Sequence, residues 1–420
     1  MSHIPREKQK ALFPLLWIML FDHTSLNLVF PVLTLLFFDA DSRFFAALTP
    51  HDIRSYWYGL CIAIPHAVNF FSAPLLGMLS DQFGRRNILL LAATGALAYA
   101  LTGAFSVLAG SMTLLFCASL LRGLFSRTNP IAQAAIGDIS PPQQRNKKML
   151  YMGYLQTAIS LGAFAGPILG GRLARSFDFA GLNFSLPFFA AAGFAVMALG
   201  LTFFTFSETL QRPKNSAGTG AFHWKPFLKL FADKRIQAIS LILLLSQVGW
   251  SLYYQFMPPI LKMLLHADAR QIGQFVGLIA LWLALATLFG IRLLSEFFNM
   301  RGILIFSLWL MFAGLALTLF FFIRPALTAH SSLPWVAAIL VAAGDVIAFS
   351  CICTLYSDAV SQEDQGKIMG MGFIVISAVW MLSAVLGGLL LALHPLLPLA
   401  VALPFVLAGI GFVCFMSELN

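Results

Sequence analysis

Long apolar segments dominate this chain and constrain its fold more than any other feature. Twelve runs of about 20 mostly uncharged residues are separated by short polar or Gly/Pro-containing connections, and about 20 apolar residues let a helix cross a bilayer. Only 10% of the 420 residues are charged, far below the roughly 25% of soluble domains. The sequence therefore predicts an all-α polytopic membrane protein with twelve transmembrane helices, at residues 12–37, 56–79, 88–109, 112–137, 150–172, 184–206, 236–264, 271–294, 302–323, 334–356, 367–393 and 396–416.

The distribution of Lys and Arg predicts the orientation of these helices. Seventeen basic residues fall in the termini and connections on one side, and seven in the connections on the other side. Cytoplasmic loops carry the excess of basic residues, so both termini are expected to be cytoplasmic. The net charge of +9 follows from this bias and predicts no nucleic-acid partner. The first apolar run lacks a clear cleavage site and is expected to remain as an anchor helix.

The chain contains an internal duplication. Seven residues between Leu79 and Leu89 match residues between Leu294 and Leu304 at a constant offset of 215, and Asp138 matches Asp358 at an offset of 220. The longest polar stretch, 207–235, separates six spans from six. We therefore predict two pseudo-symmetric six-helix bundles, 1–206 and 236–420, joined by a cytoplasmic linker at 207–235, with a substrate path between them. One chain holds both bundles, so a monomer suffices.

A series of glycines marks the fifth predicted span. Small residues at such spacing give a membrane helix a bare face that allows close backbone approach, and proline bends a helix without adding charge. The series therefore predicts a kinked helix pressed against a neighbour, as a gate between two moving halves requires. Its members are Gly153, Gly162, Gly166, Pro167, Gly170 and Gly171.

The connection after the second span has the pattern GxLxDxxGRR. Its glycines permit a tight turn, and its acid and arginines can pair with each other, with a helix end or with anionic headgroups. One interpretation is a simple turn anchored by inside positive charge; the other is a conformational switch loop. The residues concerned are Gly77, Asp81, Gly84, Arg85 and Arg86.

Four ionisable residues lie within predicted spans: Asp22, Arg122, Arg127 and Asp345. Such residues are costly in hydrocarbon and usually face a cavity or a partner. One interpretation is that these residues form two buried ion pairs that fix helix register. The other is that one of the acids titrates during transport, since burial raises a carboxyl pKa and a nearby arginine lowers it. We favour Asp22 for proton coupling, modulated by Arg122. Asp345 is second, with Arg127 as its possible partner; in a continuous helix the two arginines would lie about 140° apart.

Polar and aromatic residues in several spans are candidates for a substrate cavity. Aromatic rings with polar tips in the seventh span can stack on a planar substrate and hydrogen-bond to it; alternatively they form an aromatic belt at the membrane interface. The arginines favour an anionic or zwitterionic substrate. The candidates, beyond Arg122, Arg127 and Asp345, are Asn27, Gln133, Gln156, Gln247, Trp250, Tyr253 and Tyr254.

The switch-loop pattern resembles the signature loop of the major facilitator superfamily, and the glycine series fits that family's antiporter motif, GxxxGPxxGG preceded by a further glycine. Asp22, Thr24, Asn27 and Pro31 resemble a first-helix pattern, Arg122 stands where drug exporters have a fourth-helix arginine, and Ser207 to Leu210 resemble the end of their sixth helix. The closest resemblance is to the twelve-span drug/proton antiporters, which include tetracycline exporters.

The resemblance implies a proton-coupled antiporter of the cell membrane, with the bacterial inner membrane expected. It would export a small organic molecule, either a drug or an anionic or zwitterionic metabolite such as a siderophore, by alternating access. The alternative is a proton-coupled importer of a nutrient or a metal–siderophore complex on the same fold. In the family, the acid at Asp81 holds the cytoplasmic side closed through the eleventh helix.

The second copy of the signature loop is degenerate. Arg292 replaces the glycine equivalent to Gly77, and Asn299 replaces the one equivalent to Gly84. We therefore expect the full switching role only in the first copy.

Several other classes are disfavoured by the sequence. It contains no P-loop, no dinucleotide fingerprint and no His/Cys spacing typical of a metal site. No cofactor, metal or ATP requirement is therefore expected. A membrane-embedded enzyme would need a nucleophile or a His/acid constellation, which we do not find, and the duplicated halves disfavour a channel.

Overall fold

Helices make up nearly all of the described chain. The computed structural model describes residues 11–40, 42–46, 48–125, 128–140, 145–174, 184–210, 231–324, 333–360 and 365–415. The first half contains α2 (Leu12–Leu28), α3 (Phe30–Phe38), α4 (His51–Phe83), α5 (Arg85–Ala109), α6 (Met112–Phe125), α7 (Thr128–Ile139), α8 (Arg145–Leu173) and α9 (Leu186–Phe204).

The second half repeats this pattern of long helices. It contains α11 (Lys234–Leu265), α12 (Ala269–Leu285), the π-helix η1 (Ala286–Gly290), α13 (Ile291–Ser295), α14 (Met300–Ile323), α16 (Leu333–Asp358), α17 (Gln365–Leu393) and α18 (Leu397–Phe415). Each of the twelve predicted spans therefore coincides with a helix or with consecutive helical segments.

Prolines and side-chain caps explain where several helices begin and break. Pro31 has no N–H for the carbonyl of Asn27, and the first span divides there into α2 and α3. At the start of α12, Asp268 and Gln271 form a reciprocal capping box.

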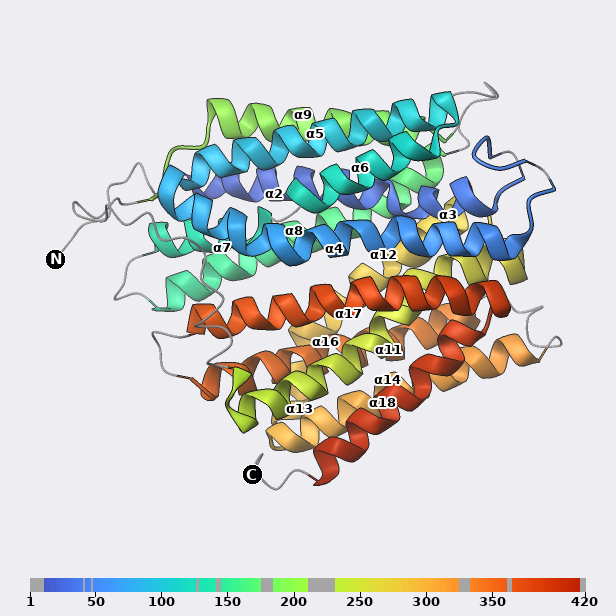
Figure 1. Ribbon diagram of the computed structural model, residues 1–420. Coiled ribbons are helices and arrows are strands. Elements are labelled where there is room, and N and C mark those ends of the chain that lie inside the picture. Colours follow the sequence, from blue (N-terminus) through green and yellow to red (C-terminus); the bar gives the residue numbers. More distant parts are fainter. Residues whose placement is uncertain are drawn as a thin grey trace.

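The two halves pack side by side as separate bundles (Figure 1). Within the first half α2 packs against α8 and α9, and α5 against α6 and α9; within the second half α14 packs against α16, and α11 against α17 and α18. The halves meet mainly where α4 packs against α17 and α8 against α12. We call the end at the left of Figure 1, where α5 and α17 begin, the basic end, and the other the opposite end.

The predicted fold class is confirmed. By length and hydropathy, nine helices in the described ranges qualify as membrane spans, and ten when the bent helix α4 counts as one span. The remaining predicted spans are also helical: one comprises α6 and α7, with residues 126–127 outside the described part, and the other is α8. This arrangement is consistent with twelve spans in two pseudo-symmetric bundles.

The halves make close contact toward the opposite end. A Cβ built on Gly59 of α4 would lie 2.7 Å from the carbonyl oxygen of Ala384 and 2.8 Å from Cα of Gly388, both in α17. The Tyr58 hydroxyl donates a hydrogen bond to the carbonyl of Gln255, at 3.0 Å. Because backbone lies directly against backbone here, this part of the interface requires residues without side chains.

An ion pair also joins the halves at the opposite end. Nζ of Lys262, near the end of α11, lies 2.7 Å from Oδ2 of Asp39, which follows α3 and is buried. The pair therefore connects the first span of one half to the seventh span of the chain. A charged pair of this kind, largely removed from water, is costly to break from one side only.

Lys262→Met is expected to weaken the closure of the opposite end by about 1–3 kcal/mol, because the buried carboxylate of Asp39 loses a charged donor. Hydrogen exchange should accelerate in residues 39–46 and 255–265, and not in α5. The double variant Asp39→Asn/Lys262→Met should recover part of the protection, since it leaves no buried charge. Unchanged exchange in Lys262→Met would show that the pair does not hold the halves together.

At the basic end the first half packs mainly on itself. One hydrophobic cluster, which includes Leu15, Ile88, Ile136 and Phe206, joins helices of the first half alone. The larger cluster includes Phe37, Tyr58, Tyr253 and Phe256 and extends across both halves. A Cβ built on Gly77 or Gly153, both nearer the basic end, would meet no atom within 4 Å. The halves are thus closed together at the opposite end and less tightly packed at the basic end.

Candidate functional site

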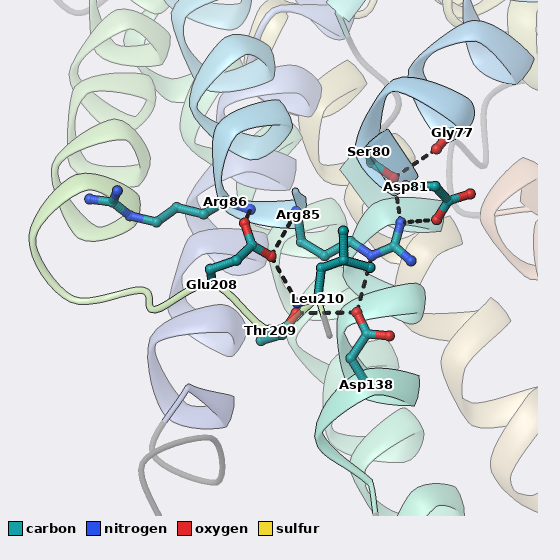
Figure 2. A network of polar contacts seen from close by, with 9 residues as sticks. All are labelled: Gly77, Ser80, Asp81, Arg85, Arg86, Asp138, Glu208, Thr209 and Leu210. Atoms are coloured by element: carbon teal, nitrogen blue, oxygen red, sulfur yellow. Dashed lines mark hydrogen bonds and ion pairs between the residues drawn. The ribbon is translucent and has the colours of Figure 1, made fainter. Parts of the chain in front are cut away.

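The signature loop forms a compact polar network at the basic end (Figure 2). The Arg85 side chain is buried at its centre: its Nη1 donates to Oγ of Ser80 at 2.6 Å and lies 2.5 Å from Oδ1 of Asp81. Its Nε donates to Oδ2 of Asp138 at 3.1 Å, and the Thr209 hydroxyl donates to the same oxygen at 3.3 Å. The Arg85 side chain therefore ties the ends of α4 and α7 to the start of α5, and Asp138 adds the connection after α9.

Among the residues that the structure describes, Asp81 pairs within its own half. Its only described partner is Arg85, and its side chain is 65% exposed. The resemblance implied that this acid holds the basic end closed through the eleventh span, here α17. An exposed Asp81 agrees with the looser packing of the halves at this end.

Glu208, in the connection that follows α9, caps the start of α5, the third span. Its carboxylate accepts hydrogen bonds from the backbone N–H groups of Arg85, at 3.0 Å, and Arg86, at 3.1 Å, at the start of α5 (Figure 2). Free N–H groups at a helix start favour a carboxylate in this position. Gly84, just before α5, has φ of 98°, and a Cβ there would collide with the Glu208 carboxylate.

The two glycines of the motif should therefore respond differently to substitution. Gly84→Ala is expected to destabilise the protein by about 1–3 kcal/mol, because alanine is strained at positive φ and displaces the capping carboxylate. Gly77→Ala is the matched control and should be near neutral, since its Cβ would meet open space. Thermal unfolding in detergent measures both. Equal losses in the two variants would contradict this account of Gly84.

The second copy of the signature loop keeps some of these contacts. Arg86 Nη2 donates to the carbonyl of Phe203 at the end of α9, and Arg301 Nη2 donates to the carbonyl of Cys414 at the end of α18, both at 2.6 Å. These arginines are equivalent in the duplication, so the contact supports the repeat. Asn299 accepts from the N–H of Gly302 and caps α14 itself, so this copy needs no glycine equivalent to Gly84.

Asp22 lies buried in α2, with 3% of its surface exposed. Its Oδ2 accepts a hydrogen bond from the Thr128 hydroxyl at 2.6 Å, and Nδ1 of His23 lies 3.7 Å away. Thr128 is the first described residue of α7, so a hydroxyl of the fourth span binds the acid of the first span. No described arginine pairs with Asp22, which leaves the predicted buried ion pair without support here.

Arg122 lies in the last turn of α6, with its guanidinium 5.9 Å from the ring centroid of Tyr99. The expected angle of about 140° between Arg122 and Arg127 stays a prediction, because residues 126–127 lie outside the described part of the chain. Arg127 itself lies outside the described residues. Its predicted pairing with Asp345 and its place in the cavity therefore stay predictions.

Asp345 is buried in α16 of the second half. Its Oδ1 accepts a hydrogen bond from Nε2 of Gln247 in α11 at 2.9 Å. The amide oxygen of Gln247 in turn accepts from the indole N–H of Trp380 in α17 at 3.2 Å. The second half thus holds its acid by a chain of neutral groups.

The aromatic residues of the seventh span lie inside the protein. Trp250 and Tyr253 are buried, and the Tyr254 ring lies 5.4 Å from that of Trp250. Tyr254 also stacks on Phe30 of the first half, with ring centroids 5.1 Å apart and an angle of 12°. This placement differs from the alternative of a lipid-facing belt and forms an aromatic wall between the halves.

The other predicted cavity residues are less closely assembled. Asn27 is half-buried and donates to the carbonyl of His23 in its own helix. Gln133 is exposed and donates to Asn129, also in its own helix, and Gln156 in α8 is exposed. These three residues are not brought into contact with Asp345 or Gln247. Among the described residues, no group of three or more His, Cys, Asp or Glu gathers as a metal site.

The glycine series of α8 packs mostly against the first span. A Cβ on Gly162 would lie 2.7 Å from the carbonyl oxygen of Leu20, and one on Gly166 would lie 2.8 Å from that of Thr24. Gly171 instead faces Gly273 of α12, at the interface between the halves, whereas Gly153 meets nothing. The series therefore joins α8 tightly to α2 within the half and touches the other half at one end.

Sequence reasoning missed three residues of this arrangement: Thr128, Phe30 and Trp380. Thr128 carries a hydroxyl within an apolar span, a signal that could have attracted attention. Phe30 and Trp380 resemble many other apolar aromatic residues of the chain. Only the packing of α4, α11 and α17 distinguishes Trp380.

The chain matches the sequence profile of the Major Facilitator Superfamily over residues 12–384. It therefore belongs to this superfamily of transporters, as the motifs predicted. Tetracycline resistance protein, class B, of Escherichia coli is 34% identical over 200 residues, which are 47% of this chain and 45% of that protein. Multidrug resistance protein 1 of Bacillus subtilis is 30% identical over 190 residues, 45% and 44% of the two chains. The chain spans about half the length of the curated relatives it matches.

Solved structures share the fold along nearly the whole chain. The crystal structure of a D-xylose-proton symporter superposes with a TM-score of 0.74 at 16% identity and covers 98% of this chain and 97% of its own. The human organic anion transporter MFSD10 (TETRAN) superposes with a TM-score of 0.67 at 18% identity and covers 97% and 99%. At such identities these likenesses define the fold alone.

Proposed function

We propose that this chain is a proton-coupled antiporter that exports a small organic molecule by alternating access. The observation that carries the proposal is the pair of buried acids, Asp22 in the first half and Asp345 in the second. Each accepts a hydrogen bond from a neutral side chain, Thr128 or Gln247. A buried carboxylate without a described arginine partner is well suited to take up and release a proton.

The two halves would be residues 1–206 and 236–420, joined by a linker at 207–235. The basic end would face the cytoplasm, with both termini, because inside connections carry the excess of Lys and Arg. The contacts of Gly59 with Gly388 and of Lys262 with Asp39 close the opposite end. This state would therefore load its substrate from the cytoplasm of a bacterial inner membrane, as a monomer.

The substrate would be a planar organic molecule with polar or charged groups. The aromatic wall of Phe30, Trp250 and Tyr254 offers faces for stacking, and the guanidinium of Arg122 favours an anionic or zwitterionic group. The names of the similar proteins, tetracycline and multidrug resistance proteins, favour a drug-like molecule. A siderophore has compatible chemistry and belongs to the same test.

Reconstituted liposomes test both the direction and the substrate class. Vesicles with an acidic lumen should accumulate a planar zwitterion such as tetracycline, because protons leaving the lumen drive antiport. A lipophilic cation and a tricarboxylate serve as comparison substrates. Uptake driven instead by an acidic exterior would favour the importer alternative, since symport carries substrate and proton the same way. Accumulation independent of either gradient would refute proton coupling.

A further inference from the structure

A chain of hydrogen bonds leads from Asp345 to the surface where the halves meet. Asp345 and Gln247 are both buried, and Nε2 of Gln247 donates to the carboxylate at 2.9 Å. The indole Nε1 of Trp380 donates to Oε1 of Gln247 at 3.2 Å. The three residues belong to α16, α11 and α17, so the chain crosses three helices of the second half.

The last member of this chain rests on the first half. The Trp380 ring lies 5.2 Å from the ring of His66 in α4. It also lies 5.9 Å from Tyr254, which stacks on Phe30 of the first half. Trp380 therefore links the polar chain to the contact between α17 and α4, through which the two halves pack.

The hydrogen-bonding chemistry fixes the orientation of the Gln247 amide. An indole N–H can only donate, so the amide oxygen must face Trp380, and the amide nitrogen then faces Asp345. An ionised carboxylate can only accept, which suits that nitrogen. A protonated carboxyl can also donate, and it no longer requires one orientation of the amide. The charge state of Asp345 therefore influences the position of the Gln247 amide oxygen, which accepts the hydrogen bond from Trp380.

We propose that Gln247 is a positioning residue that couples the charge state of Asp345 to the contact between α17 and α4. Ionised Asp345 holds the amide in the orientation that binds Trp380, and Trp380 stays against His66. Protonation removes this restraint and frees Trp380 to leave the interface. The proposal rests on the proposed function to the extent that Asp345 carries a transported proton.

Fluorine NMR of the full chain tests this coupling. The protein is labelled with 5-fluorotryptophan in lipid nanodiscs, and the Trp380 resonance is assigned by its loss in Trp380→Phe. Asp345→Asn, which is neutral, should shift or broaden this resonance. In a Gln247→Leu background the same substitution should leave the resonance unchanged, because the connection is absent. Ser350→Ala, which removes a hydroxyl that donates to the carbonyl of Val346 within α16, is the matched control and should have no effect.

Two results would overturn the proposal: an unchanged Trp380 resonance in Asp345→Asn, or a shift that persists in the Gln247→Leu background. Gln247→Met provides the same test if the leucine variant does not fold as judged by size-exclusion chromatography. Failure of the proposed function is distinguishable, because it would appear as normal pH-driven transport by both Asp22→Asn and Asp345→Asn in liposomes, whatever the resonance shows.

Discussion

Replacing Asp22 with asparagine is expected to abolish transport driven by a pH gradient, with a loss of at least about a hundredfold, because an amide has no proton to exchange at physiological pH. The asparagine oxygen can still accept the hydrogen bond from Thr128, so the local packing should persist. Uptake of labelled substrate into liposomes with an imposed pH gradient measures the loss. Asp345→Asn should also reduce gradient-driven transport.

A second measurement separates lost coupling from lost folding. Exchange of substrate across the membrane without a pH gradient should continue in Asp22→Asn, because no net proton movement is needed. Asp52→Asn, at an exposed acid in the first turn of α4, is the control and should transport normally. The assignment of proton coupling to these acids would be wrong if Asp22→Asn and Asp345→Asn each kept proton-driven transport.

Gly59→Val is expected to prevent closure of the opposite end. The added side chain would meet the backbone of Ala384 and Gly388, which cannot move aside as a flexible side chain could. Overpacking of this kind costs about 1–3 kcal/mol, enough to shift the ratio of closed to open protein roughly 5- to 150-fold. Transport should fall accordingly, because alternating access requires both states.

The state of the opposite end can be measured directly. Spin labels at positions 48 and 266, in a background without the native cysteines, should lie farther apart in Gly59→Val than in the parent protein. Gly200→Val in α9 is the matched control, since a Cβ at Gly200 meets no atom within 4 Å. Equal distance distributions in Gly59→Val and its parent would contradict the proposed role of this contact.

The helices could be predicted from the sequence because each membrane span carries its own signal. An apolar run of about 20 residues needs no knowledge of its neighbours to be assigned. The internal repeat could also be recognised from the sequence, because Arg86 and Arg301 match at a fixed offset. In the structure both bind a carbonyl at the end of the last helix in their half.

The partners of the candidate residues could not be predicted in the same way. Arg122 was expected to modulate Asp22, and the hydroxyl of Thr128, which donates a hydrogen bond to that acid, was not foreseen. Glu208 was noted only as part of a motif, and its capping of α5 depends on how the connection after α9 returns to Gly84. Such contacts depend on packing between distant segments, which a single sequence does not contain.

Proton movement linked to substrate movement is the most direct test of the central claim. Liposomes containing the protein and a trapped pH-sensitive dye are given substrate on the outside at equal pH on both sides. The account predicts that substrate entry makes the lumen more alkaline, since protons leave in exchange, and that Asp22→Asn abolishes this response. Acidification of the lumen, or substrate entry without any pH change, would contradict it.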